Sequence, residues 1–356
     1  MSTYWSALVA VDVRIPGKGN GMTRIRTIRG LVAGGVVLLA AAGWSTALGK
    51  TGEGEAPPTR ATAAPSAAKA YRYDYFDNFY SIAAGDRSAL WIVGNSGRIL
   101  HSLDAGLTWS VQSSGTEENL LSVSFFGPGK GWVCGHGGTI LHTEDGGNTW
   151  TRQNSRTSHP IFKVQFLNDK VGFASGYFGL FLRTSDGGKT WENKSLGEDV
   201  TLRGMWFPSE RVGYVVGEFG TILKTENGGA SFTRLNSPVS STLFDVHFLD
   251  PDSGCAVGID GSVLVTVDGG RRWVKEESGV HDHLVGVAGD GNRTVAVGLR
   301  GTVTRKEKGG RWVPARTGTL NWLSGVLLVE GGKGFVVGAH GTILPLEGIL
   351  NKGVKR

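Results

Sequence analysis

One short pattern recurs seven times along this chain of 356 residues, and the recurrence restricts the possible folds severely. A hydrophobic residue precedes Gly-x-x-Gly in each copy, and successive leading glycines are 41, 41, 41, 41, 40 and 40 residues apart. These glycines are Gly94, Gly135, Gly176, Gly217, Gly258, Gly298 and Gly338. A period of about 40 residues with strand-like content is that of a β-propeller blade. The repeat therefore predicts an all-β, seven-bladed β-propeller over residues 71–350.

Each unit divides into four short strands. In the second unit we expect strands at 121–126, 131–135, 139–143 and 149–153, separated by glycine-rich turns. The chain holds 57 glycines, and tight hairpins that need a positive φ explain this excess. The sequence thus predicts four-stranded blades.

A second motif, the Asp-box, lies between the third and fourth expected strands. The positions that recur from repeat to repeat carry an acid or amide and then an aromatic residue. These are Asp104, Asp145, Asp186, Asn227 and Asp268, followed by Trp109, Trp150, Trp191, Phe232 and Trp273. We expect each acid to accept hydrogen bonds from its own turn, and each aromatic ring to pack between blades. The sixth unit has Lys308 in place of the acid, which a shared catalytic or metal-binding role would not tolerate.

The seventh unit ends early. Residues 342–346 can form a third strand, but no fourth strand with a tryptophan follows. Residues 71–76 alternate like a strand and precede the first inner strand. We expect this N-terminal strand to complete the last blade and close the ring, which removes an open sheet edge. Residues 351–356 form a basic tail.

The first 49 residues have the pattern of an export signal or an N-terminal membrane anchor. Arg24, Arg26 and Arg29 precede the uncharged stretch 30–49, which is just long enough to span a bilayer but rich in glycine. Cleavage of the signal is the favoured interpretation, and the absence of a cysteine after the apolar run excludes a lipoprotein anchor. Residues 50–70, rich in Ala, Pro and Gly, predict a flexible linker.

The net charge of +6 does not indicate nucleic-acid binding. The first 49 residues contain five basic residues and one acid, and their removal leaves 32 basic and 30 acidic residues. A nearly neutral folded region lacks the basic patch that a polyanion requires. No nucleic-acid partner is expected.

The combination of Gly-x-x-Gly and Asp-box at this period resembles the photosystem II assembly and stability factor family, seen for example in residues 135–150 and 217–232. The resemblance implies a non-enzymatic propeller without cofactor or metal. It also implies an exported protein, in a periplasm or a compartment like the thylakoid lumen, that lies near a membrane. Its partner would be a membrane-protein precursor or a subunit of an envelope complex during assembly. A monomer is expected.

The x-x pairs of the Gly-x-x-Gly turns are expected to form a ring on one face of the propeller. Its candidate partner-binding residues are His136, Tyr177, Phe178, Glu218, Phe219, Asp260, Arg300 and His340. Exposed aromatic rings with charges around them fit a protein contact, whereas ordinary turn variability explains them equally well.

Other interpretations receive less support. His281, Asp282 and His283 offer too few ligands for a zinc site. Cys134 and Cys255, three blades apart, are expected to be buried free thiols. A sialidase-like glycoside hydrolase would need arginines, a Tyr–Glu pair and an acid at the propeller centre. The Arg-Ile-Pro at residues 14–16 resembles a sialidase element but precedes the export segment. A carbohydrate-binding propeller would show tryptophans on its ligand face.

Overall fold

The computed structural model describes residues 14–16, 22–24, 71, 74–329 and 333–350. Contacts divide the chain into two units, Met1–Ala63 and Ala64–Arg356. In the first unit, β1 (Arg14–Pro16) pairs antiparallel with β2 (Met22–Arg24). The rest of the predicted export segment, the linker at 50–70 and the tail at 351–356 lie outside the described residues.

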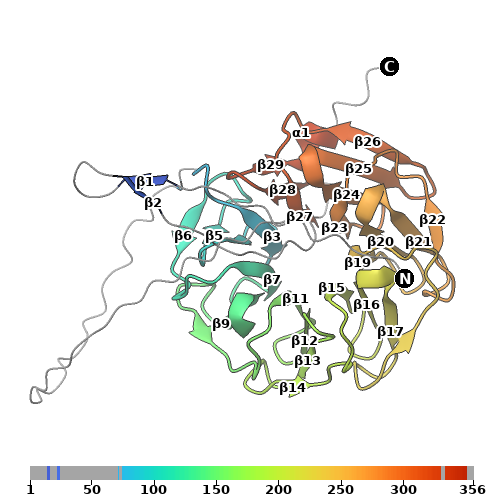
Figure 1. Cartoon of the computed structure of the whole chain (residues 1–356), viewed down its shortest axis with the longest axis horizontal. Coiled ribbons are helices and arrows are strands. Elements are labelled where there is room, and N and C mark those ends of the chain that lie inside the picture. Colours follow the sequence, from blue (N-terminus) through green and yellow to red (C-terminus); the bar gives the residue numbers. More distant parts are fainter. Residues whose placement is uncertain (1–13, 17–21, 25–70, 72–73, 330–332, 351–356) are drawn as a thin grey trace, which may run out of the picture. The chain divides into compact units, whose positions relative to one another are not determined.

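Seven antiparallel sheets succeed one another around a ring in the second unit (Figure 1). Blade 1 contains β3 (Phe79–Ala84), β4 (Leu90–Gly94), β5 (Ile99–Ser102) and β6 (Ser110–Gln112). Blade 2 contains β7 (Leu120–Phe126), β8 (Lys130–Gly135), β9 (Ile140–Thr143) and β10 (Thr151–Arg152). Blade 3 contains β11 (Ile161–Phe166), β12 (Gly172–Gly176), β13 (Phe181–Thr184) and β14 (Glu192–Asn193). Blade 4 contains β15 (Leu202–Trp206), β16 (Gly213–Gly217), β17 (Ile222–Thr225) and β18 (Thr233–Arg234).

The remaining three blades follow the same order. Blade 5 contains β19 (Leu243–Phe248), β20 (Gly254–Gly258), β21 (Val263–Thr266) and β22 (Val274–Glu276). Blade 6 contains β23 (Leu284–Gly289), β24 (Arg293–Gly298), β25 (Thr302–Glu307) and β26 (Trp312–Arg316). Blade 7 contains β27 (Leu323–Val329), β28 (Lys333–Gly338) and β29 (Ile343–Pro345), followed by helix α1 (Leu346–Leu350). The prediction of a seven-bladed all-β propeller is confirmed.

The core lies between neighbouring sheets. The second strands of blades 1, 3, 4 and 5 are buried along their whole length, because both of their faces are covered. Trp91 on β4 stacks on Phe125 at the end of β7, with ring centroids 3.6 Å apart. Trp132 on β8 stacks on Phe166 of β11 at the same centroid distance, 3.6 Å. Aromatic packing between blades therefore holds the ring together.

The junction of blades 7 and 1 repeats the contacts of the other junctions. The backbone N–H of Gly341 donates to the Asp77 carbonyl at 2.7 Å, as that of Gly97 donates to Glu118 at 2.9 Å. Trp109 of blade 1 packs edge-on against Phe335 of blade 7. The inner strands β27 and β3 lie side by side (Figure 1). The ring is closed by the packing of blade 7 on blade 1.

The expected outer strand at 71–76 is not confirmed. Residues 72 and 73 lie outside the described residues, and neither Tyr71 nor residues 74–76 belong to a strand. Tyr71 donates its backbone N–H to Trp109 of blade 1 at 2.7 Å. In the described part, blade 7 has three strands. Helix α1 follows β29 and packs against β28, with Leu346, Ile349 and Leu350 buried. The expectation of four strands holds for the other six blades.

The alternation of strand direction sorts the loops onto two faces. The Gly-x-x-Gly turns and the blade-to-blade loops share one face, here called the turn face. Their shared position is shown by hydrogen bonds such as Gly220 N–H to the Ser241 carbonyl, 3.0 Å. The Asp-box turns and the loops between first and second strands share the opposite face, here called the Asp-box face. Within the described residues no helix has the length and apolar character needed to cross a membrane.

Candidate functional site

The second variable residue of every Gly-x-x-Gly turn has a left-handed backbone. Blade 2 has a glycine there, Gly137. The other six blades carry a residue with a side chain at φ between 50° and 56°: Ser96, Phe178, Phe219, Asp260, Arg300 and His340. This conformation costs a residue with a Cβ about 1 kcal/mol or more. The turns therefore hold bulky side chains where glycine would fit with less strain.

Tyr177 and Phe178 form an aromatic cluster at the turn of blade 3. Their rings meet edge-on with centroids 4.5 Å apart, and the His159 ring lies 5.5 Å from that of Phe178. Both side chains remain about two-fifths exposed, at 39 % and 45 %. A rigid aromatic group that stays in water provides a contact surface at little entropic cost.

Arg203 of β15 contacts Phe162 of blade 3 and the turn of its own blade. Its guanidinium lies 4.6 Å from the Phe162 ring centroid, and one of its nitrogens lies 4.0 Å from Glu218 Oε1. Burial lowers the pKa of Arg203, and the charge of Glu218 opposes that shift. The Arg203 Nε atom is buried without a hydrogen-bond partner among the described residues. Arg203 also belongs to the residues that line the central channel.

Phe219 is the most exposed aromatic residue of the predicted ring, at 75 %. It follows Glu218, whose carboxylate accepts the backbone N–H of Thr201 at 3.0 Å. Glu218 is thereby tied to the loop that enters β15, and Phe219 projects from an ordered turn. We call Tyr177, Phe178, Phe219, Glu218 and Arg203 the blade 3–4 patch.

The structure places the other predicted ring residues on separate loops. Asp260 lies 3.5 Å from His283 Nδ1, and Arg300 Nε lies 3.8 Å from Asp282. The His340 ring stacks on Tyr75 with centroids 4.1 Å apart. His136 opens the 3₁₀ turn η1 (His136–Gly138) of blade 2.

Among the described residues, these contacts bind each turn to its neighbouring loop and do not reach the blade 3–4 patch. These ion pairs involve Asp282 and His283, two of the three residues of the His281–His283 segment. In the described residues no group of three potential metal ligands occurs.

A second group of exposed apolar residues on the turn face was missed from the sequence. Tyr75 and Phe76 are 68 % and 77 % exposed, beside His340. Leu320 and Trp322, in the loop entering blade 7, are also exposed. The alternating pattern at 71–76 predicts a strand that includes Tyr75, and the loop at 317–322 belongs to neither repeated motif, so the repeats give no signal for either group.

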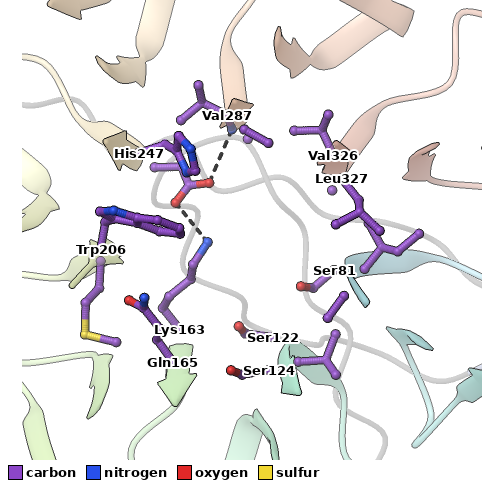
Figure 2. A pocket seen from close by; sticks show the side chains of 18 of the residues that line it. Ser81, Ser122, Ser124, Lys163, Gln165, Trp206, His247, Val287, Val326 and Leu327 are labelled. Atoms are coloured by element: carbon purple, nitrogen blue, oxygen red, sulfur yellow. Dashed lines mark hydrogen bonds and ion pairs between the residues drawn. The ribbon is translucent and has the colours of Figure 1, made fainter. Parts of the chain in front are cut away.

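The inner strands of all seven blades surround a central channel of about 500 Å³. In Figure 2, polar side chains from blades 3 to 5 occupy one side, including Lys163 and His247, while Val326 and Leu327 of blade 7 lie opposite. Lys163 Nζ lies 2.9 Å from Asp245 Oδ1, and the other Asp245 oxygen accepts the Val287 N–H at 3.3 Å. The buried carboxylate is thus neutralised and hydrogen-bonded.

His247 and Trp206 lie beside this ion pair. Their ring centroids are 4.2 Å apart. Burial lowers the pKa of His247 to about 4, although the nearby Asp245 opposes the shift. The imidazole is therefore neutral at neutral pH.

Side chains of the inner strands also join neighbouring blades. Ser122 accepts the backbone N–H of Val164 at 3.2 Å, and Ser124 accepts that of Phe166 at 3.0 Å. Gln165 makes two hydrogen bonds with the backbone of Phe207, at 2.8 and 3.1 Å. The polar groups of the channel wall are thus largely used for assembly of the ring.

The Asp-box acids are used within their own hairpins. Asp145 accepts the Thr143 hydroxyl at 2.8 Å, the Thr149 N–H at 2.9 Å and the Thr149 hydroxyl at 2.7 Å. Asp104 and Asp186 make the same set, and Asn227 and Asp268 keep the two bonds to Oδ1. These hydrogen bonds lower the pKa of Asp104 to about 2.

The Asp-box aromatic residues lie at the blade interfaces. Trp109, Trp191 and Trp273 are buried, and Trp150 and Phe232 are partly buried. Trp191 and Trp273 meet Phe166 and Phe248 edge-on.

The channel does not contain the residues that a sialidase-like hydrolase would need. Among its described lining residues, Arg203 is the only arginine and Asp245 the only acid, and Asp245 is paired with Lys163. Among the described tryptophans, Trp206 lines the channel and Trp322 is exposed on the turn face. Both cysteines are free and buried, on the second strands of blades 2 and 5, as predicted.

Comparisons with known proteins identify related propellers. The family model described as Photosynthesis system II assembly factor YCF48 matches residues 66–160 and 152–239. No curated protein sequence matches the chain significantly. Among solved structures, one described as "YCF48 bound to D1 peptide" has 19 % identity and a TM-score of 0.66, covering 78 % of this chain and 94 % of its own.

Two further structures extend the comparison. YCF48 from Cyanidioschyzon merolae has 18 % identity and a TM-score of 0.66, covering 78 % of this chain and 98 % of its own. The WD40 propeller domain of Doa1 has 14 % identity and a TM-score of 0.64, over 78 % and 95 % of the two chains. At these identities the structural likeness describes the fold.

Proposed function

Because this chain is a photosystem II assembly factor-like propeller, with family repeats matched over residues 66–239, we propose that it is a non-enzymatic scaffold. It binds a subunit of a membrane-protein complex while that complex is assembled. We further propose that the propeller acts after export, in a periplasm or lumen-like compartment, where the N-terminal segment directs it. The host complex is either a photosystem or another envelope complex.

The blade 3–4 patch is the observation that carries this proposal. Phe178 and Phe219 have left-handed backbones at φ 56° and expose 45 % and 75 % of their surface. A large apolar side chain in such a position costs conformational energy and gains little burial in the isolated protein. A partner that covers these rings would recover that cost.

The chemistry of the patch indicates an extended peptide segment as the bound element. Aromatic rings of Tyr177, Phe178 and Phe219 provide apolar contact, while Arg203 and Glu218 add opposite charges beside them. The similar YCF48 structure is described as bound to a D1 peptide, which supports a peptide as the type of partner.

The channel supports a role without catalysis. Its acid is paired with Lys163, its partly buried histidine has a pKa lowered to about 4, and its polar side chains are used for contacts between blades. A catalytic acid or base would need a free group with access to a substrate. The Asp-box acids are likewise occupied by their own turns.

Site-specific photo-crosslinking in membranes of the source organism tests the proposal. The photoreactive residue replaces Phe178 or Phe219 in the full chain. Val267 and Leu107 serve as matched controls, because they are 79 % and 85 % exposed but lie in Asp-box turns. We expect Phe178 and Phe219 to crosslink to a subunit of a membrane complex, identified by mass spectrometry. Crosslinks only from Val267 or Leu107, or only to soluble proteins, would contradict the proposal.

A further inference from the structure

The junction of blades 5 and 6 lacks the aromatic pair that fills the four preceding junctions. At each of those, an aromatic residue of the second strand stacks on a phenylalanine at the end of the next inner strand. The pairs are Trp91 with Phe125, Trp132 with Phe166, Phe173 with Phe207, and Tyr214 with Phe248, with centroids 3.6, 3.6, 3.8 and 3.9 Å apart. The equivalent residues between blades 5 and 6 are Cys255 and Gly289.

Three of these aromatic residues also donate a hydrogen bond to the turn of the next blade. Trp91 and Trp132 donate from Nε1 to the carbonyls of Gly146 and Gly187, at 3.2 and 3.0 Å. Tyr214 donates its hydroxyl to Gly269 at 2.7 Å. The space between neighbouring blades at this position, here called the slot, therefore holds a flat ring with one hydrogen-bond donor and provides a backbone acceptor for it. Cys255 supplies neither the ring nor this donor.

Part of the missing volume is filled and part remains open. A Cβ on Gly289 would lie 2.1 Å from Leu249 Cδ2, so the Leu249 side chain occupies the place of the absent phenylalanine. Cys255 is only 6 % exposed and packs with Val287 and Trp312, but none of its described neighbours is an aromatic residue stacked as in the other pairs. A cavity of about 340 Å³ remains there, lined by Leu249, Cys255, Val265, Gly309 and Trp312 among others.

The next two junctions do not share this gap. Val295 of blade 6 packs in one cluster with Leu346, Ile349 and Leu350 of α1. At the junction of blades 7 and 1, Phe335 again provides the aromatic residue and meets Trp109. The open slot therefore distinguishes the blade 5–6 junction from its described neighbours.

The turn beside the cavity differs as well. In blade 5, residues 266–273 connect the paired Val265 and Val274. In blade 6, the shorter segment 307–311 connects the paired Lys306 and Trp312, and it has no Asp-box acid. Gly309, the counterpart of the acceptor Gly269, is retained at the cavity.

Charged groups of both signs line the cavity, among them Arg293, whose Nε lies 3.7 Å from Asp290 Oδ2. Lys306 Nζ lies 2.6 Å from Glu276 Oε2, which also accepts the Trp312 Nε1–H at 2.9 Å. Asp250 accepts the backbone N–H of Ser253 at 2.7 Å. Glu307 and Lys308 add opposite charges at the rim. Such a lining is complementary to an uncharged ligand, since either charge would be left without a partner.

We propose that this cavity binds one small, neutral aromatic molecule of the indole or phenol type. Its ring takes the place that Trp91, Trp132 and Tyr214 occupy at the other junctions. Its single donor is directed to the blade 6 turn, where Gly309 supplies the carbonyl. A dry cavity of roughly 150 Å³ already accommodates benzene, so the volume here suffices for one bicyclic ring. This site lies on the Asp-box face and is independent of the partner surface proposed above.

Calorimetric titration of the full chain with indole and with phenol tests the assignment. Two variants separate a filled slot from an open one. Cys255→Ala leaves the slot open, and we expect it to bind like the wild type. Cys255→Trp supplies the missing ring from the chain itself, and we expect it to weaken binding at least about tenfold while raising the melting temperature. Equal binding by Cys255→Trp, or no binding of either compound to the wild type, would overturn the proposal.

A measurement on the wild type remains valid if Cys255→Trp does not fold. Burial raises the pKa of both cysteine thiols, so neither is activated, and their modification rates report access. Cys134 is fully buried and Cys255 is 6 % exposed at the cavity. We expect a small uncharged thiosulfonate to modify Cys255 faster than Cys134, and indole to slow the reaction at Cys255 alone. Modification of Cys255 unaffected by saturating indole, or protection only by tryptophan-containing peptides, would refute a small-molecule site.

Discussion

Lys163 of blade 3 and Asp245 of blade 5 form an ion pair across the blade that separates them, with 2.9 Å between Nζ and Oδ1. The residue of blade 4 at the same register is Gly204. Because it has no side chain, the lysine can reach past it to the carboxylate. The ion pair thus links blades 3 and 5 at the channel wall, and Gly204 of blade 4 leaves the space in which it forms.

We expect the substitution Asp245→Asn to lower the free energy of unfolding by about 2 kcal/mol, since it leaves the Lys163 charge without its partner. Lys163→Met should have a comparable cost, because it leaves the carboxylate unpaired. The double variant should cost less than the sum of the two. Denaturant unfolding of the four proteins measures the coupling, and additive effects would show that the pair contributes nothing.

The substitution Gly204→Ala is expected to destabilise the protein by about 2 kcal/mol through overpacking. An added Cβ would lie 2.5 Å from the Asp245 Cα and 2.8 Å from the Phe244 carbonyl oxygen, so blade 5 would have to move. Gly348→Ala is the matched control, because nothing lies within 4 Å of its added Cβ. Thermal unfolding should separate the two, and similar melting temperatures would contradict this account of Gly204.

The stability of the propeller should decrease as the pH falls from about 6.5 to about 4. The pKa of His247 is lowered by burial to about 4 in the folded protein and returns to about 6.5 on unfolding. The unfolded chain therefore binds the proton first, and the loss is on the order of 3 kcal/mol by linkage. His247→Asn should reduce the slope of stability against pH in this window. An unchanged slope would assign the acid sensitivity to other groups.

Phe219→Gly should raise the free energy of unfolding by up to about 1 kcal/mol, because glycine adopts the left-handed conformation at φ 56° without a Cβ penalty. The same substitution should weaken binding of the partner. Phe219→Ala provides the control, since it also removes the ring but keeps the penalty. Chemical denaturation and the crosslinking yield would be compared, and an equally stable Phe219→Gly would refute the strain.

Asp145→Ala should destabilise blade 2 by about 1 kcal/mol, since three hydrogen bonds to Thr143 and Thr149 are lost. Asp145→Asn should cost much less. Blade 4 already uses Asn227, whose amide oxygen accepts the Thr225 hydroxyl and the Ser231 N–H. A large effect of Asp145→Asn on the melting temperature would show that the charge itself is needed.

The sequence by itself determined the number of blades, the position of the turns and the burial of both cysteines. Those features follow from local chemistry that recurs every 40 or 41 residues, such as glycines at positive φ in the Gly-x-x-Gly turns. The sequence also predicted that Tyr177, Phe178 and Phe219 lie on one face of the propeller. It could not show that Arg203 contacts Phe162, because this contact crosses from blade 4 to blade 3.

Only the tertiary structure decided how the ring closes, which charges meet in the channel and where a cavity remains. The expected strand at 71–76 rested on an alternating pattern, whereas blade 7 closes on blade 1 by the packing of β27 against β3 and is followed by α1. The sequence predicted Cys255 as a buried thiol, and the structure shows a cavity beside it. The extent of this cavity depended on whether a distant side chain filled the space, and Leu249 fills only the part beside Gly289.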